Sequence, residues 1–177
     1  MNVLGIDLGG TGIKAAPVDP VAGTLLSDRF RVPTPQPSTP QAVGEAVQAI
    51  VEQFEWQGPI GFGFPGVVKH GWTMTAANVH EGWVKLDAQM MLQQMTNHEV
   101  FLINDADAAG MAEMRFGAGR DARGVVLVVT IGTGIGTALF SDGSLLPNTE
   151  LGHLIIRGKE AEHRASERVR IEKELSW

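Results

Sequence analysis

The sequence contains no cysteine and no long apolar run. Without cysteine the chain can form neither disulfides nor thiolate metal sites. No segment approaches the roughly 20 apolar residues of a membrane-spanning helix, and the first residues form a strand pattern where a leader peptide would be charged and then apolar. Acidic residues outnumber basic ones and give the chain a formal charge of −6. This negative charge argues against a general nucleic-acid binder. We therefore expect a cytoplasmic protein without a nucleic-acid or membrane partner.

The composition is that of a folded globular chain. Its 177 residues are 44% hydrophobic and 19% charged, enough to bury a core and nominally one domain. Alternating strand and helix patterns indicate an α/β fold with parallel strands. We expect strands at residues 3–6, 13–18, 25–30, 60–64 and 100–103, helices at residues 42–54 and 106–115, and a proline-rich surface connector at residues 32–40.

The first strand ends in a carboxylate beside a glycine turn. Asp7 is followed by Gly9, Gly10, Thr11 and Gly12. Glycines let backbone N–H groups approach an anion closely, and Asp7 can hold Mg²⁺ against a phosphate, directly or through water. The alternative is a plain glycine hairpin in which Asp7 is a turn residue.

A second turn of the same kind follows the apolar run at residues 125–129, which the unbroken pattern predicts to be a fully buried strand. This turn offers Thr130, Gly132, Thr133 and Gly134 as a second phosphate cradle. A single turn of this type is more often a hairpin, but a pair is rarer by chance. Two such loops suggest a cleft between lobes.

Asn104 and Asp105 lie where the strand at residues 100–103 ends, the place where open α/β sheets hold reactive groups. Asp105 is the candidate general base, although Asp105 or Asp107 could equally cap the following helix. Glu150 and His153 share a turn and could bind sugar hydroxyls, or could belong to a solvated loop.

Two further turns complete the predicted lining of the site. Gly63-Phe64-Pro65-Gly66 is a rigid turn, and Ala77-Asn78 adds an amide for hydrogen bonding. Together with the earlier motifs, these turns resemble the ROK family of bacterial sugar kinases. The other motifs that carry the resemblance are Asp7-Leu8-Gly9-Gly10-Thr11, Asn104-Asp105, the second glycine loop and Glu150-Leu151-Gly152-His153. The sequence from Phe64 to Gly71 is similar to that of the polyphosphate-dependent glucokinases of the family.

The resemblance implies an actin-like, ribonuclease-H-like two-lobed α/β fold with glucose in the cleft between the lobes. Asp105 would be the catalytic base, and glucose would be bound by Asn78, Asn104, Asp105, Glu150, His153 and Glu162. The phosphate donor, polyphosphate or ATP, would contact Asp7, Gly9, Gly10, Thr11, Lys14, Thr130, Gly132, Thr133 and Gly134. Mg²⁺ would be held by Asp7 through water.

The chain departs from the family pattern in two ways. It lacks the cysteine-rich zinc motif of many ROK proteins, so we expect no zinc. It also stops where the family continues, which predicts a C-terminally truncated chain with an N-terminal lobe at residues 1–115 and an incomplete second lobe at residues 116–177. Exposed edges on such a lobe favour association, and we expect a homodimer.

The donor and the activity stay open at this point. Polyphosphate needs a basic track, for which the candidates are Lys14, Lys69, Arg115, Arg120, Arg123, Arg157, Lys159, Arg164, Arg168 and Arg170. The alternatives are an ATP-dependent hexose or N-acetylhexosamine kinase, a sugar-responsive repressor and a non-catalytic sugar-binding fragment. A repressor would carry a DNA-binding segment ahead of the first phosphate motif, but Asp7 stands at the very start of this sequence.

Overall fold

The computed structural model describes residues 1–76 and 78–176, so Ala77 of the predicted lining and Trp177 lie outside it. The chain forms two compact units, Met1–Asp105 and Ala106–Trp177. The sequence predicts that the first lobe ends at Arg115, whereas contacts in the structure group the helix after Asp105 with the second unit. In the part of the chain described, no helix is long and apolar enough to cross a membrane.

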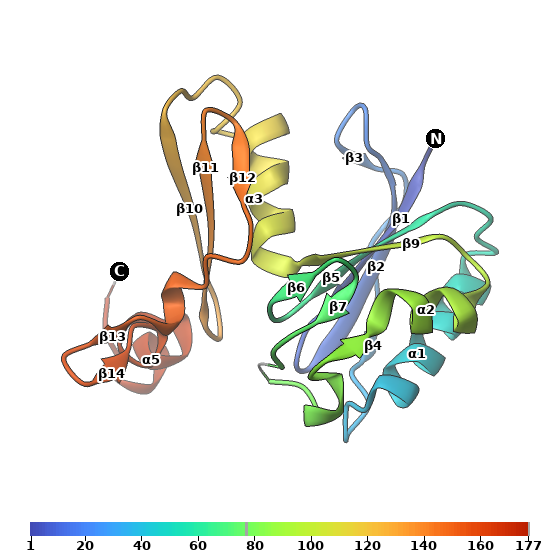
Figure 1. Ribbon diagram of the computed structural model, residues 1–177, viewed down its shortest axis with the longest axis horizontal. Helices are drawn as coiled ribbons and strands as arrows, with labels where there is room; N and C mark the ends of the chain where they lie inside the picture. The colour runs from blue at the N-terminus through green and yellow to red at the C-terminus, as the bar shows by residue number, and fades with distance from the viewer. Residues whose placement is uncertain (77, 177) are drawn as a thin grey trace. The chain divides into compact units, whose positions relative to one another are not determined.

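The first unit is built on a six-stranded mixed sheet (Figure 1). Its order is β3-β2-β1-β5-β9, with β4 also paired to β2. The parallel members expected from the sequence are confirmed, because β1, β5 and β9 pair in parallel, while β2 runs antiparallel to β1. The strands are β1 (Val3–Leu8), β2 (Gly12–Asp19), β3 (Thr24–Leu25), β4 (Phe30–Pro33), β5 (Ile60–Phe64) and β9 (Val100–Asn104).

One strand expected from the sequence is wrong. Residues 25–30 were expected to be continuous, but the structure has a two-residue β3 and a separate β4. Ser27 and Asp28 lie between them, and short polar side chains of this kind favour turns because they compete for backbone hydrogen bonds. Both short strands still pair with β2, so the antiparallel arrangement holds.

Two capped helices accompany this sheet. In α1 (Pro40–Gln53), Thr39 accepts a hydrogen bond from Ala42 N, and proline starts the first turn. In α2 (Ala88–Thr96), Asp87 caps the start and a left-handed Asn97 ends the helix. Their apolar residues and those of the sheet form one core around Leu4, Leu8, Ile60, Phe62 and Trp83. Smaller elements of the unit are η1 (Glu81–Trp83) and the sheet of β6 (Val68–Lys69), β7 (Trp72–Thr73) and β8 (Leu86–Asp87).

The second unit contains the three-stranded antiparallel sheet β10-β11-β12. Helix α3 packs on β11 through Gly110, where an added Cβ would overlap Ala138 and touch the Phe140 ring. The elements are α3 (Asp105–Phe116), β10 (Val125–Ile131), β11 (Ile135–Ser141), β12 (Ser144–Leu146), η2 (Leu151–His153), β13 (Ile155–Ile156), β14 (Lys159–Glu160), α4 (Glu162–Ala165) and α5 (Glu167–Glu172).

Strand β10 is not the fully buried strand that its apolar run predicts. Val125 is 74% exposed, and Leu127, Val129 and Ile131 are each 47–48% exposed, whereas Val126 and Val128 are half-buried. The prediction failed because an apolar run implies burial only when both faces of the sheet are covered. Among the described residues of this unit, α3 covers one face alone. We call Val125, Leu127, Val129 and Ile131 the exposed β10 face.

Candidate functional site

Two carboxylates of the first unit border the same glycine. Asp7 on β1 is the register partner of Gly63 on β5, and Gly63 is the partner of Ile103 on β9. A Cβ built on Gly63 would lie 3.7 Å from Asp105 Cα, which is ordinary contact. The strands are parallel, so their carboxyl ends meet at one edge of the sheet. That edge therefore holds both Asp7 and Asp105.

The first glycine loop continues from this edge. Gly9 N donates to Gly12 O at 3.0 Å, which closes the loop. Lys14 Nζ lies 3.3 Å from Asp7 Oδ2, and both side chains are about half exposed. A Cβ on Gly10 would lie 3.4 Å from Asn78 O. The first unit thus brings Asn78, a predicted sugar ligand, next to the predicted phosphate loop.

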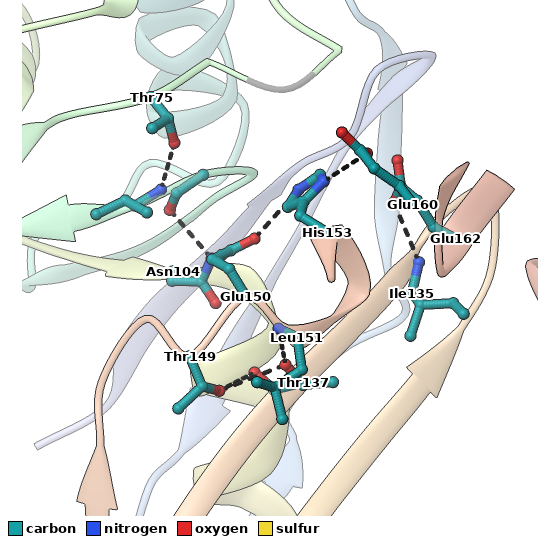
Figure 2. Close-up of polar contacts among 12 residues, drawn as sticks. Thr75, Asn104, Ile135, Thr137, Thr149, Glu150, Leu151, His153, Glu160 and Glu162 are labelled. Carbon is teal, nitrogen blue, oxygen red and sulfur yellow. Dashed lines mark hydrogen bonds and ion pairs between the residues drawn. The ribbon is translucent and has the colours of Figure 1, made fainter. Parts of the chain in front are cut away.

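Asn104 has a structural task at the end of β9. It is 3% exposed, and its Nδ2 donates to Gly66 O at 3.0 Å (Figure 2). The same turn is held from its other side, because Val67 N donates to Thr75 Oγ1 at 2.9 Å. Asn104 therefore fixes the predicted Gly63–Gly66 lining against the strand that leads to Asp105. Thr75 belongs to this support, although no pattern in the sequence identifies it as a site residue.

Asp105, the candidate base, and Asp107, the other candidate helix cap, occupy different environments. Asp105 is the first residue of α3. Asp107 is 1% exposed, and its Oδ2 accepts a hydrogen bond from Asn148 N at 2.8 Å. Burial raises the pKa of Asp107, and the bond from Asn148 opposes that rise. Asp107 thus anchors the segment that leads to Glu150.

Glu150 and His153 meet in the second unit, as Figure 2 shows. Glu150 adopts a left-handed conformation before η2, with φ of 44°. His153 Nε2 lies 3.5 Å from Glu150 Oε2, and His153 Nδ1 lies 3.0 Å from Glu160 Oε2. The hydrogen bond to Glu160 is the main cause that raises the pKa of His153, and the same bond lowers the pKa of Glu160. The imidazole of His153 therefore keeps its second proton to a higher pH than a free histidine does.

Thr137 on β11 positions this turn. Its Oγ1 accepts a hydrogen bond from Leu151 N at 2.9 Å and lies 3.4 Å from Thr149 Oγ1. Gly152 allows η2 to rest on β11, since a Cβ there would overlap Ile135 O. Sequence reasoning missed Thr137, Thr149 and Glu160, because contacts across the sheet leave no local pattern.

The second glycine loop lies against a carboxylate. Gly132 N donates to Gly134 O at 3.0 Å, and Glu162 Oε2 accepts from Ile135 N at 3.4 Å. A Cβ on Gly134 would come within 2.5 Å of that same oxygen. Glu162, a predicted sugar ligand, therefore borders the predicted phosphate cradle. A negative charge beside the loop repels a phosphate unless a cation or a proton offsets it.

Three side chains of the second unit could share a cation. His153, Glu160 and Glu162 offer ligand atoms that all lie within 4.8 Å of one another. Exposed acidic groups commonly gather without a metal, and His153 is already hydrogen-bonded to Glu160 and ion-paired with Glu150, so the charges of the side chains account for this group. The expectation of no zinc stays a prediction.

Several cations proposed for a donor track have local partners. Arg164 donates to Ile156 O and Arg157 O, both at 2.6 Å, while Arg170 lies 3.9 Å from Glu167. Arg168 lies 3.9 Å from Glu172. These bonds stabilise the C-terminal segment and reduce what its cations can offer to an anion.

Comparison with known proteins places the chain in a family. The ROK family profile matches residues 3–166.

This chain belongs to the ROK family.

Within the ROK family the sequence is 48% identical, over 167 residues, to the polyphosphate glucokinase of Mycobacterium tuberculosis (strain CDC 1551 / Oshkosh). That match covers 94% of this chain and 63% of the relative, so the chain spans less than two thirds of the relative's length.

Solved ROK structures confirm the actin-like α/β fold expected from the resemblance. The inorganic polyphosphate/ATP-glucomannokinase of Arthrobacter sp. strain KM superposes with a TM-score of 0.94 at 49% identity, covering 99% of this chain and 72% of that one. A ROK family glucokinase from Streptomyces griseus, solved with glucose and AMPPNP, gives a TM-score of 0.83 at 29% identity, covering 97% and 59%.

Proposed function

We propose that this ROK chain acts in the transfer of a phosphoryl group from inorganic polyphosphate to the 6-hydroxyl of glucose, giving glucose 6-phosphate. The observation that carries the proposal is the edge of the first unit, where Asp105, Asp7 and the Gly9–Gly12 loop lie together. The relatives named for polyphosphate and glucose support the choice of substrates.

Asp105 is the general base in this proposal. The glucose O6 attacks the terminal phosphorus of the donor while its proton moves to the Asp105 carboxylate, and the bond from phosphorus to the bridging oxygen breaks. The shortened polyphosphate leaves with the electron pair of that bond. Phosphoryl transfer depends mainly on positioning and charge stabilisation, so a placed base and a cradle of amides are the parts that the protein must supply.

Side chains with hydrogen-bonding groups bind glucose in this proposal. Asn78 and Asn104 contribute amides from the first unit, whereas Glu150, His153 and Glu162 contribute from the second. His153 Nδ1 is bonded to Glu160, so His153 would meet a sugar hydroxyl through Nε2 in place of Glu150, and Glu150 would accept from a sugar hydroxyl. Donors and acceptors of this kind favour a polyhydroxyl ligand over an apolar one.

Asp7 fits the Mg²⁺ that phosphoryl transfer requires. Its carboxylate is half exposed at the strand end, beside the loop, and Mg²⁺ typically binds one or two carboxylates together with waters and substrate phosphates. Bound there, the ion would neutralise charge on the donor phosphates. Lys14, now 3.3 Å from the same carboxylate, would supply a second positive charge.

ATP is the second candidate donor. The Arthrobacter relative is named for both polyphosphate and ATP, and the Streptomyces glucokinase was solved with an ATP analogue. Both donors present a terminal phosphate to the same loop, so the proposed roles of Asp7 and Asp105 are unchanged. The homodimer and the cytoplasmic location stay predictions.

The direct test compares donors. Glucose phosphorylation is measured with polyphosphate and with ATP, using this chain and a form completed with the segments of the Mycobacterium relative that the chain lacks. The proposal expects transfer from polyphosphate by the completed form. Transfer from ATP but not from polyphosphate would refute polyphosphate as the donor. Glucose binding without transfer from either donor would reduce the role of the protein to sugar binding.

A further inference from the structure

Every backbone carbonyl from Gly9 to Thr11 is held by one segment of the chain. Thr34 Oγ1 donates to Gly9 O at 2.6 Å, and Gln36 Nε2 donates to Gly10 O at 3.2 Å. Thr11 O accepts from Thr34 N and from Arg31 Nη2, each at 3.4 Å. We call Arg31, Thr34 and Gln36 the carbonyl clamp.

The clamp determines where the loop amides point. In a trans peptide the C=O of one residue and the N–H of the next point in opposite directions. The peptide bonds of the loop are trans, because the only cis bond in the described residues is Gln36–Pro37. Holding the oxygens of Gly9 and Gly10 toward the clamp therefore turns the N–H groups of Gly10 and Thr11 away from it.

Within the described residues, those two amides donate no hydrogen bond. Across residues 1–76 and 78–176, the N–H of Gly10 and that of Thr11 donate to no other group, whereas Gly9 N closes the loop on Gly12 O. Neighbouring amides that point the same way form a concave site for an anion. The clamp thus leaves a pair of aligned donors beside Asp7.

Thr34 is the buried member of the clamp, whereas Arg31 and Gln36 are exposed. Thr34 is 4% exposed, so its hydroxyl lies inside the protein on the loop carbonyl. A Cβ on Gly12 would come within 2.6 Å of Arg31 Nε, which means that the guanidinium lies close against the loop backbone. Arg31 is also the register partner of Lys14, and Lys14 is the partner of Asp7. Two cations therefore accompany the aligned amides, and both favour a negative ligand.

We propose that Arg31, Thr34 and Gln36 are positioning residues that aim the amides of Gly10 and Thr11 at a phosphate of the donor. The ligand class is a polyphosphate chain or the phosphates of a nucleotide. This inference rests on the proposed function. Without the clamp, a loop carbonyl could rotate toward the phosphate, and its negative end would repel the ligand.

The test uses Thr34→Val, which keeps the shape of the side chain and removes the hydroxyl donor. Thr34→Ser restores the donor. Thr39→Ala is the matched control, because it removes the N-cap of α1 and lowers stability without contacting the loop. Binding of tripolyphosphate and of glucose to the whole chain is measured by calorimetry, so that no turnover is needed.

We expect Thr34→Val to weaken tripolyphosphate binding by about tenfold, as the loss of one buried hydrogen bond would. Thr34→Ser and Thr39→Ala should bind tripolyphosphate as the wild type does, and all variants should keep their glucose affinity. In the completed form, Thr34→Val should raise KM for the donor more than it lowers kcat.

Unchanged binding by Thr34→Val, an equal loss in Thr39→Ala, or no tripolyphosphate binding by the wild type would each overturn the clamp. Failure of the proposed function looks different. A completed form that binds tripolyphosphate in a Thr34-dependent manner but transfers no phosphate to glucose would refute the function and leave the clamp intact. A completed form that transfers phosphate to glucose, with a Thr34→Val variant that keeps normal donor affinity, would refute the clamp and leave the proposed function intact.

Discussion

The sheets of the two units differ in how many of their apolar side chains are exposed. In the first unit, α1 and α2 pack with Leu4, Phe62 and the other core residues of the sheet. The residues that alternate with them on β1 and β5 include Gly5, Asp7 and Gly63, and Phe101 on the edge strand β9 is 55% exposed. In the second unit, α3 packs on β11, and the exposed β10 face is apolar. A partly exposed sheet face can be stable in water when glycine and charge occupy it, but an apolar face favours association with a partner.

The two units therefore differ in what stabilises them and in the candidate site residues that they carry. Buried large side chains place most of the packing energy in the first unit, so Asp7 and Asp105 stand at the edge of a rigid sheet. The second unit presents Glu150 and His153 on a turn that polar contacts hold to β11. We therefore expect the second unit to be more sensitive to pH and less sensitive to loss of a single apolar side chain.

The largest expected effect comes from matched leucine deletions. Leu4→Ala removes a side chain with no exposed surface and should cost about 2–5 kcal/mol in the free energy of unfolding. Leu127→Ala, at a position 48% exposed, should change it by about 0.5 kcal/mol or less. Urea unfolding followed by circular dichroism measures both. Equal losses would mean that the exposed β10 face is covered in solution.

The next largest expected effect is a loss of stability when one of two helix glycines is replaced by alanine. Gly110→Ala would drive a methyl group into Ala138 and the Phe140 ring, for which overpacking costs about 1–3 kcal/mol. Gly44→Ala on α1 meets the flexible ends of Met95 and Met91, and alanine favours a helix. Thermal unfolding should show a clear loss of Tm for Gly110→Ala and little change for Gly44→Ala. The opposite order would contradict the packing of α3 on β11.

The smallest expected effect is a pH dependence confined to the second unit. The pKa of His153 is raised, so its stabilising contribution is complete below about pH 6.5 and is lost as pH rises through the higher folded value. The pKa of Glu160 is lowered, so its contribution is present above about pH 4.5 and is lost as pH falls through the lower folded value. Stability from this pair is therefore greatest between those limits.

Unfolding free energies at pH 6 and pH 8.5, measured with chelator present, test this pair. The wild type should be less stable at the higher pH, and His153→Gln should reduce that difference. Glu160→Gln should reduce it too, because it removes the main cause of the shift. A difference that survives both substitutions would have its origin in other groups.

Sequence reasoning was most successful where the pattern is local. Strand β5 and the carboxyl end of β9 follow from short apolar runs, and the motif order identified the family before the fold was known. Helix α2 was missed, although the cap at Asp87 and the left-handed Asn97 are signals that could have identified it.

The rest depends on contacts between distant residues. Thr34 and Gln36 lie in a proline-rich stretch that reads as a surface connector, and their bonds to Gly9 and Gly10 span 25 and 26 residues of sequence. The exposure of β10 likewise depends on what covers it, which no run of valines can reveal. Sequence patterns thus predict the groups proposed to do the chemistry, but they do not reveal the residues that hold those groups in place.

The most direct test of the central claim compares one substitution from each unit in the completed form. Asp105→Asn keeps the shape and capping ability of the side chain but cannot accept the proton, so single-turnover phosphorylation of glucose should be lost while the Kd for glucose stays within a few-fold. Glu150→Gln should instead weaken glucose binding, by about 1–3 kcal/mol. Near-normal turnover by Asp105→Asn would contradict the account, because the base would then lie elsewhere.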